Sequence, residues 1–148
     1  MNDETRLPDI SSPPAPTAMT ASVSAPPSLA GLRLFVVEDD AVVAMILEAN
    51  LADLGCVIVD LAVSVQDALR RLVDTVADVA LLDVNLGGET AFPVADALAE
   101  RGIPLVFATG YGSAGLEGPY RTAPVLTKPY SLDDLADALS AIARGTAS

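Results

Sequence analysis

Polar residues that could carry out chemistry follow several short apolar runs of this chain. Asp83 comes directly after residues 79–82, a run typical of a strand buried on both faces of a parallel sheet. Other runs are followed by three consecutive acids at 38–40, by Thr109 and by Lys128, the only lysine of the chain. An ionised carboxylate, an ammonium group and a hydroxyl placed together suit phosphoryl transfer onto an aspartate.

A divalent cation fits the same set of residues. Glu38 and Asp39 would face Asp83 if their strands are neighbours, and unpaired like charges at that distance repel strongly. The chain contains no histidine, so carboxylates and a main-chain carbonyl are the available ligands. These oxygen donors favour Mg²⁺, with Mn²⁺ as a second possibility.

The elements that must position these residues alternate along the chain. Apolar runs predict strands at 32–37, 56–59, 79–82, 105–108 and 124–127, and helical periodicity predicts helices at 41–54, from 64, at 90–100 and from 131. This alternation predicts an α/β fold, a flavodoxin-like (βα)5 doubly wound parallel sheet with strand order 2-1-3-4-5. In that order Asp83 lies at the switch point, where ligands bind.

Local signals mark where the helices begin and where one is missing. Ser64 with Asp67, and Ser131 with Asp134, have the spacing of capping boxes. The helix at 41–54 is expected to bury Ile46 on its apolar face. Four glycines and a proline within residues 110–119 predict that helix 4 is short or mobile, or absent.

Composition limits the class of protein. The chain has 148 residues, 51% of them hydrophobic, enough for one domain, which we expect at 30–145 after a disordered Pro/Ser/Ala-rich tail at 1–29. A formal charge of −12 argues against nucleic acid or a membrane as partner. No segment has the features of a secretion signal or a membrane span. Cys56, the only cysteine, is expected to be buried in the core as a free thiol. A free thiol is typical of a reducing compartment, so we expect a cytoplasmic protein.

The motifs at the strand ends resemble those of the receiver domain of two-component response regulators, over about residues 31–144. The resemblance lies in the order Val-Val-Glu-Asp-Asp at 36–40, Leu-Leu-Asp at 81–83, Phe-Ala-Thr-Gly at 107–110 and Thr-Lys-Pro at 127–129. It implies a role for each of six residues: Asp83 as phosphoacceptor, Glu38 and Asp39 as the metal pocket, Asn85 as a main-chain carbonyl ligand, Lys128 as a phosphoryl contact and Thr109 as the switch hydroxyl.

The Phe-Ala-Thr-Gly string also resembles the stand-alone receivers of the FATGUY subgroup. Receivers usually carry an aromatic switch residue three positions before the lysine, where this chain has Val125. We therefore expect a different switch, in which the segment after Thr109 becomes ordered and Tyr111 is a candidate contact.

The resemblance implies a phosphoacceptor signalling domain, not an enzyme beyond its own Mg²⁺-dependent autophosphorylation and autodephosphorylation. The phosphoryl donor would be a sensor histidine kinase or a histidine phosphotransfer protein. No output module is recognised after Arg144, so a downstream protein is the expected partner.

Two other classes of function remain open. One is a phosphorylation-independent binding module of the same fold, which failure to bind Mg²⁺ would favour. The other is a phosphatase similar to haloacid dehalogenases, which also form an aspartyl-phosphate. Against it, Asn85 stands where those enzymes carry a second aspartate.

Several of these residues also have ordinary structural interpretations. One of the acids at 38–40 is expected to cap the first helix. Asn85 alone would be a turn former. Tyr120 and Tyr130 are interpreted as aromatics at the solvent edge.

Overall fold

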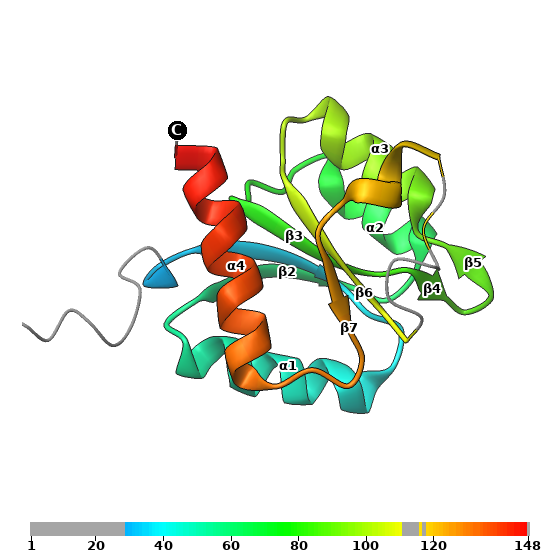
Figure 1. The fold of residues 1–148 in the computed structure, drawn as a ribbon. Helices are drawn as coiled ribbons and strands as arrows, with labels where there is room; N and C mark the ends of the chain where they lie inside the picture. Colours follow the sequence, from blue (N-terminus) through cyan, green and yellow to red (C-terminus); the bar gives the residue numbers. More distant parts are fainter. Residues whose placement is uncertain (1–28, 111–115, 117, 148) are drawn as a thin grey trace, which may run out of the picture.

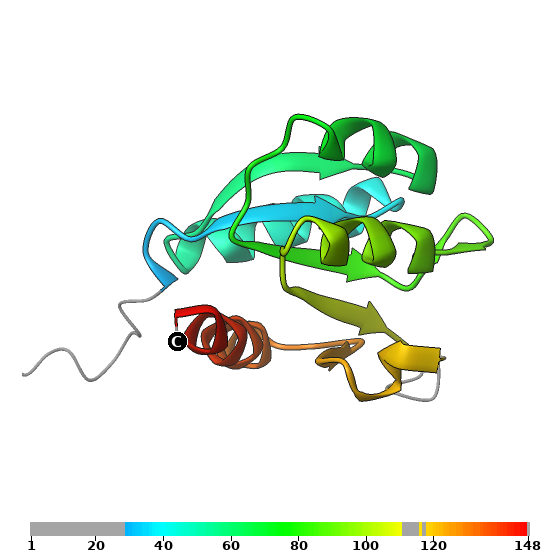
Figure 2. The ribbon, with the colours of Figure 1, turned by 90° about the horizontal axis from the view of Figure 1, so that it is seen from above.

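A five-stranded parallel sheet with strand order β2-β1-β3-β6-β7 forms the centre of the computed structural model, which describes residues 29–110, 116 and 118–147 (Figures 1 and 2). These five strands correspond to the five predicted ones, so the flavodoxin-like order 2-1-3-4-5 is confirmed. The strands are β1 (Arg33–Val37), β2 (Val57–Ala62), β3 (Val79–Asp83), β6 (Leu105–Thr109) and β7 (Val125–Thr127). The helices are α1 (Ala41–Asp53), α2 (Val65–Leu72), α3 (Phe92–Glu100), the 3-10 helix η7 (Gly118–Thr122) and α4 (Leu132–Ala147).

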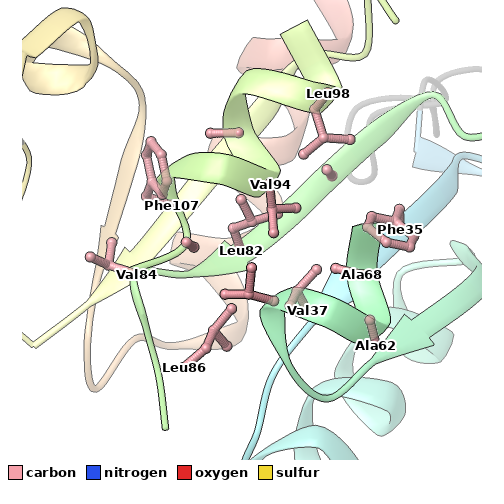
Figure 3. Close-up of a cluster of buried hydrophobic side chains, with 14 of the residues drawn as sticks. Phe35, Val37, Ala62, Ala68, Leu82, Val84, Leu86, Val94, Leu98 and Phe107 are labelled. Carbon is pink, nitrogen blue, oxygen red and sulfur yellow. The ribbon is translucent and has the colours of Figure 1, made fainter. Parts of the chain in front are cut away.

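Strand β3 is buried along its whole length because helices cover both faces of the sheet. One core cluster packs α2 and α3 onto one face around Phe35, Leu82 and Phe107 (Figure 3). The other packs α1 and α4 onto the opposite face around Leu34 and Leu81. Successive side chains of β1 and β3 therefore pack into the cores on opposite faces of the sheet, because side chains alternate along a strand.

The start of α3 and the end of β2 differ from prediction, because strand pairing extends beyond the predicted limits. The predicted helix 90–100 begins only at Phe92, because β4 (Asn85–Leu86) and β5 (Glu89–Thr90) form an antiparallel hairpin that sequence analysis missed. Strand β2 runs on to Ala62, beyond the predicted end at 59, and pairs with β1 with a register shift between Leu34 and Phe35.

The buried face of α1 also differs from prediction. Ala44, Leu47 and Leu51 are buried, whereas Ile46 is 57% exposed, so its predicted place in the core is wrong. Helix α1 is apolar on nearly all sides, and its periodicity therefore did not identify the face that packs on the sheet.

Two predicted features fall largely outside the described residues. Residues 1–28 of the predicted tail are not described, and Leu29, its last residue, is buried in the core on the α1 and α4 side of the sheet. Residues 111–115 and 117, within predicted helix 4, are not described either. In that region the structure describes η7, which begins with the last glycine and the proline of the glycine-rich stretch. No helix in the described part of the chain is long and apolar enough to cross a bilayer.

Two serines, one just before α4 and one within it, give stability predictions of opposite sign. Ser131 and Asp134 form the predicted capping box, since each backbone N–H donates to the other's side chain, at 3.1 and 3.0 Å. Ser140 Oγ is buried and has no hydrogen-bond partner among the described residues. We expect Ser140→Ala to raise the free energy of unfolding by about 1 kcal/mol, because it removes an unsatisfied hydroxyl and improves helix propensity.

Ser131→Ala is the matched variant and should lower the free energy of unfolding by about 1 kcal/mol, because it removes the cap. Urea unfolding of both variants and the wild type measures the two changes. A loss of stability in Ser140→Ala would contradict the prediction, because it would mean that the hydroxyl contributes to the fold.

Candidate phosphoacceptor site

The ends of four neighbouring strands bring the predicted residues to one edge of the sheet. Val37 is in register with Leu82, so Glu38 and Asp83 emerge side by side from β1 and β3. Asp83 is in register with Ala108, which places Thr109 next along β6. The Lys128 backbone N–H donates to the Thr109 carbonyl at 2.8 Å, so the lysine extends from the end of β7.

Three carboxylates form an acidic cluster there: Glu38, Asp39 and Asp83 each offer an oxygen within 4.8 Å of the others. Glu38 and Asp83 are buried, at 4% and 9% exposure, whereas Asp39 is exposed. The cluster therefore reaches from the interior of the sheet edge to solvent, where a ligand can enter.

Lys128 contacts two members of the acidic cluster. Its Nζ donates to Asp83 Oδ2 at 3.0 Å and lies 3.6 Å from Glu38 Oε1. Burial lowers the pKa of Lys128, but the hydrogen bond and charge of Asp83 and the charge of Glu38 outweigh this effect and raise the pKa above its ordinary value. The ammonium group is therefore charged at neutral pH and adjacent to the candidate nucleophile.

One lysine does not neutralise the acidic cluster. The pKa of Glu38 is raised to about 7, chiefly because the side chain is buried and also because of the charge of Asp83, although the Asp40 N–H and the charge of Lys128 act in the opposite direction. A divalent cation would relieve this repulsion, and the donors offered are the hard oxygens that Mg²⁺ prefers. The residues present fit a magnesium site.

The two aspartates after Glu38 have different roles. Asp40 caps α1, because its Oδ1 accepts from the N–H groups of Val42 and Val43 at 2.9 and 3.2 Å. This confirms the prediction that one of the three acids is a helix cap. Asp39 Oδ2 instead accepts from the Gly87 N–H at 2.9 Å, which orients Asp39 toward β3 and into the cluster.

The β4–β5 hairpin holds the loop after Asp83. Gly87 and Gly88 form its two-residue turn with φ of 62° and 91°, values that favour glycine. Asn85 donates its N–H to Asp83 Oδ1 at 3.3 Å, and its side-chain oxygen accepts from Gly88. The Gly-Gly pair between short extended segments was the signal that could have predicted this hairpin.

The remaining predicted residues have separate outcomes. Thr109 is buried at 4% exposure at the end of β6. Tyr111, the candidate switch contact, lies outside the described residues. Tyr120 and Tyr130 both have intermediate exposure and pack against the two cores, which agrees with their interpretation as aromatics at the solvent edge. Cys56 is buried as expected, and its Sγ donates to the Leu29 carbonyl.

The sheet is flavodoxin-like, and an aspartate bound to a lysine lies in an acidic cluster at its carboxyl edge. This combination is typical of one class of protein, the α/β signalling domains that accept a phosphoryl group on aspartate. The family described as response regulator receiver domain matches residues 34–140 of this chain. The chain belongs to that family, whose members act in two-component signalling. It is a signalling phosphoacceptor domain rather than a classical enzyme.

Several known proteins are similar to this chain. The transcriptional regulatory protein DltR from two strains of Streptococcus agalactiae is 32% identical over 111 residues, which cover 70% of this chain and 48% of DltR. The chain thus spans about half the length of the curated relatives it matches.

Among solved structures, SdrG from Sphingomonas melonis Fr1 is 44% identical, with a TM-score of 0.67 over 77% of this chain and 97% of SdrG. The BeF3-activated conformation of SdrG from Pseudomonas melonis Fr1 matches with the same identity and TM-score, over 77% of this chain and 98% of that one. PhyR from Brucella abortus, at 23% identity and a TM-score of 0.67 over 81% of this chain and 51% of PhyR, shares the fold.

The raised pKa of Glu38 predicts a pH-dependent stability. Because the folded pKa is about 7 against an ordinary 4.5, the folded chain holds this proton more tightly than the unfolded chain. The free energy of unfolding should therefore fall as pH rises from 4.5 to about 7 and stay low above it. Without metal at pH 8, Glu38→Gln should be more stable than the wild type by about 1–2 kcal/mol, a figure reduced for solvent screening.

Urea unfolding in the presence of a chelator, at pH 4.5 and pH 8, measures this difference. At pH 4.5 the advantage of the glutamine variant should shrink, because the glutamate is then mostly protonated in the folded chain. A constant advantage at both pH values would mean that the charge of Glu38 is not its cause.

Proposed function

We propose that this receiver domain, at residues 30–145, accepts a phosphoryl group on Asp83 from a phosphohistidine of a sensor histidine kinase or a histidine phosphotransfer protein. The observation that carries the proposal is the 3.0 Å hydrogen bond from Lys128 Nζ to Asp83 Oδ2 inside an acidic cluster. Asp78 also has a cationic partner, Arg33, but among the described residues it is the group of Glu38, Asp39 and Asp83 that combines such a partner with clustered carboxylates.

In the proposed reaction a carboxylate oxygen of Asp83 attacks phosphorus in line. An O–P bond forms, the P–N bond of the phosphohistidine breaks, and the imidazole leaves with the bonding electrons. Asp83 needs no general base, because a carboxylate attacks in its ionised form. Lys128 neutralises the phosphoryl oxygens, and the Thr109 hydroxyl is the further donor from β6.

Glu38, Asp39, Asp83 and the main-chain carbonyl of Asn85 would hold Mg²⁺, or Mn²⁺ in its place. When bound, the cation supplies positive charge that screens the carboxylates and the incoming phosphoryl group from each other. Mg²⁺-dependent autophosphorylation from small phosphodonors and autodephosphorylation by water are the only activities we assign to the domain itself.

We propose a cytoplasmic, stand-alone receiver that signals through protein contacts, with neither nucleic acid nor membrane as a direct partner. The match to SdrG, which covers 97% of that chain at 44% identity, supports a stand-alone role. The Phe-Ala-Thr-Gly string at 107–110 supports membership of the FATGUY subgroup. The surface formed by η7, β7 and α4 is the proposed contact for the downstream protein.

Amide chemical shifts recorded first with Mg²⁺ and then with Mg²⁺ plus beryllofluoride, a phosphoryl mimic, test the proposed function. We expect Mg²⁺ to shift the signals of Glu38, Asp39 and Asp83, and the mimic to add shifts at Thr109 and Lys128. No response to either addition would contradict phosphorylation and favour a binding module that uses only its surface. Turnover of a small phosphomonoester would favour the phosphatase alternative.

A further inference from the structure

Three aromatic rings from separate elements meet beside the core on the α2 and α3 face of the sheet. Tyr120 of η7 stacks on Phe92 of α3 with a centroid distance of 5.5 Å and an interplanar angle of 10°. Phe107 of β6 meets Tyr120 edge-on at 5.5 Å and Phe92 at 6.0 Å. This aromatic cluster, Phe92, Phe107 and Tyr120, attaches η7 to α3 and to the sheet.

A polar contact adds to the ring packing. The Tyr120 hydroxyl donates a hydrogen bond to Asp96 Oδ1, one turn further along α3 from Phe92. Burial and the Asp96 carboxylate raise the pKa of Tyr120 to about 12, so the phenol keeps its proton at neutral pH. The contact is therefore a charge-assisted hydrogen bond, a stronger kind than one between neutral groups.

Two elements that leave the phosphoacceptor site lead to the aromatic cluster. Phe107 lies two residues before Thr109 in β6, so both side chains project from the same face of the strand. Phe92 follows the β4–β5 hairpin, whose Gly87 N–H donates to Asp39. A displacement of either element at the site would change the ring contacts of Tyr120.

The residue in register with Phe107 on β7 is Val125, which packs against the same core. Its side chain is small and carries no polar atom, so it cannot hydrogen-bond to α3. Of the described residues on η7 and β7, Tyr120 is the aromatic residue that contacts α3. The aromatic connection to the site therefore comes from η7 rather than from the edge strand.

Each carboxylate oxygen of Asp83 accepts a hydrogen bond. Its Oδ1 accepts from the Asn85 N–H and its Oδ2 from Lys128 Nζ. An O–P bond to either oxygen must alter one of these contacts, and Lys128 is joined through its backbone to Thr109 of β6. The Tyr120 contacts thus occur together with the hydrogen bond between Lys128 and Asp83.

We propose that Tyr120, through its hydrogen bond to Asp96, stabilises the arrangement in which Lys128 is hydrogen-bonded to Asp83, and so regulates how readily the domain adopts its phosphorylated state. This inference rests on the proposed function, because it requires Asp83 to accept a phosphoryl group. Tyr120 is a positioning residue in this account and does not contact the reacting atoms. A phosphoryl mimic binds the phosphorylated arrangement better. It should therefore bind more tightly when the hydrogen bond between Tyr120 and Asp96 is removed.

The test is the affinity for beryllofluoride in the presence of Mg²⁺, measured by titration of amide signals in the wild type and in Tyr120→Phe. The variant keeps the ring and loses the hydroxyl. We expect it to bind the mimic about three- to tenfold more tightly. Without the mimic, its signals at residues 118–122 should already lie part of the way toward the positions found in mimic-bound wild type.

Asp96→Ala removes the acceptor and should give the same gain, and the double variant should gain no more than either single one. Arg121→Gln, an exposed change in the same 3-10 helix, is the control and should bind like the wild type. If Tyr120→Phe loses stability but binds the mimic with wild-type affinity, Tyr120 is only structural and the inference is wrong. If the wild type itself does not bind the mimic, the proposed function has failed instead.

Discussion

Replacing Asp83 with asparagine is expected to abolish phosphoryl labelling of the protein. The amide lacks the anionic oxygen that forms the O–P bond, and no other carboxylate in the acidic cluster pairs so closely with Lys128. Loss of a covalent nucleophile should reduce the rate of labelling by at least about 1,000-fold. Labelling by a small phosphodonor with Mg²⁺, followed by intact mass spectrometry, measures the change without a cognate kinase.

The fold of Asp83→Asn should remain intact, because the asparagine is nearly the same size and removes one charge from a repelling cluster. Asp40→Asn is the matched control: it makes the same chemical change two residues from Glu38, and asparagine caps a helix as well as aspartate does. The control should label like the wild type. Labelling of Asp83→Asn at its normal rate would disprove the assignment of the phosphoacceptor.

Replacing Lys128 with alanine should give the second largest loss. The ammonium group lies 3.0 Å from Asp83 Oδ2, so it is close to the negative charge that gathers during transfer. Removal of one such charge from a preorganised site typically slows a reaction by about 100- to 1,000-fold. The rate of labelling by the same small phosphodonor at saturating Mg²⁺ measures this effect.

Lys128→Arg separates charge from geometry. It keeps the positive charge, but the planar guanidinium group replaces a compact ammonium and should restore only part of the rate. Arg33→Ala, which removes a cation bound to Asp78 at the opposite end of β1 and β3, is a control for general loss of charge. Wild-type labelling in Lys128→Ala would show that the lysine serves the fold and not the transfer.

The site was largely predictable because its residues are attached to strand ends. Asp83, Thr109 and Lys128 each follow an apolar run, and parallel strands bring their carboxyl ends to one edge. Glu38 and Asp39 follow the same rule. The sequence predicted that one of the three acids at 38–40 caps α1, but it did not say which one. The hydrogen bonds in the structure identify Asp40 as the cap.

Features that depend on contacts distant in sequence were not predicted. The exposure of Ile46 depends on which side of a uniformly apolar helix meets the sheet. The hairpin at 85–90 depends on pairing between two-residue strands that are too short for a periodic signal. Tyr120 stacks on Phe92 and meets Phe107 edge-on, although these partners lie 28 and 13 positions earlier in the chain, and nothing near Tyr120 in the sequence marks them.

By itself the sequence determined the fold class, the order of the elements and the identity of the residues at the carboxyl edge, because hydrophobic periodicity and strand length are local properties. Only the tertiary structure decided the distances among Glu38, Asp83 and Lys128, the raised pKa of Glu38 and the contact of Tyr120 with Asp96. The physical reason is that register, burial and charge coupling arise between segments far apart in the chain, and they exist only once the sheet has assembled.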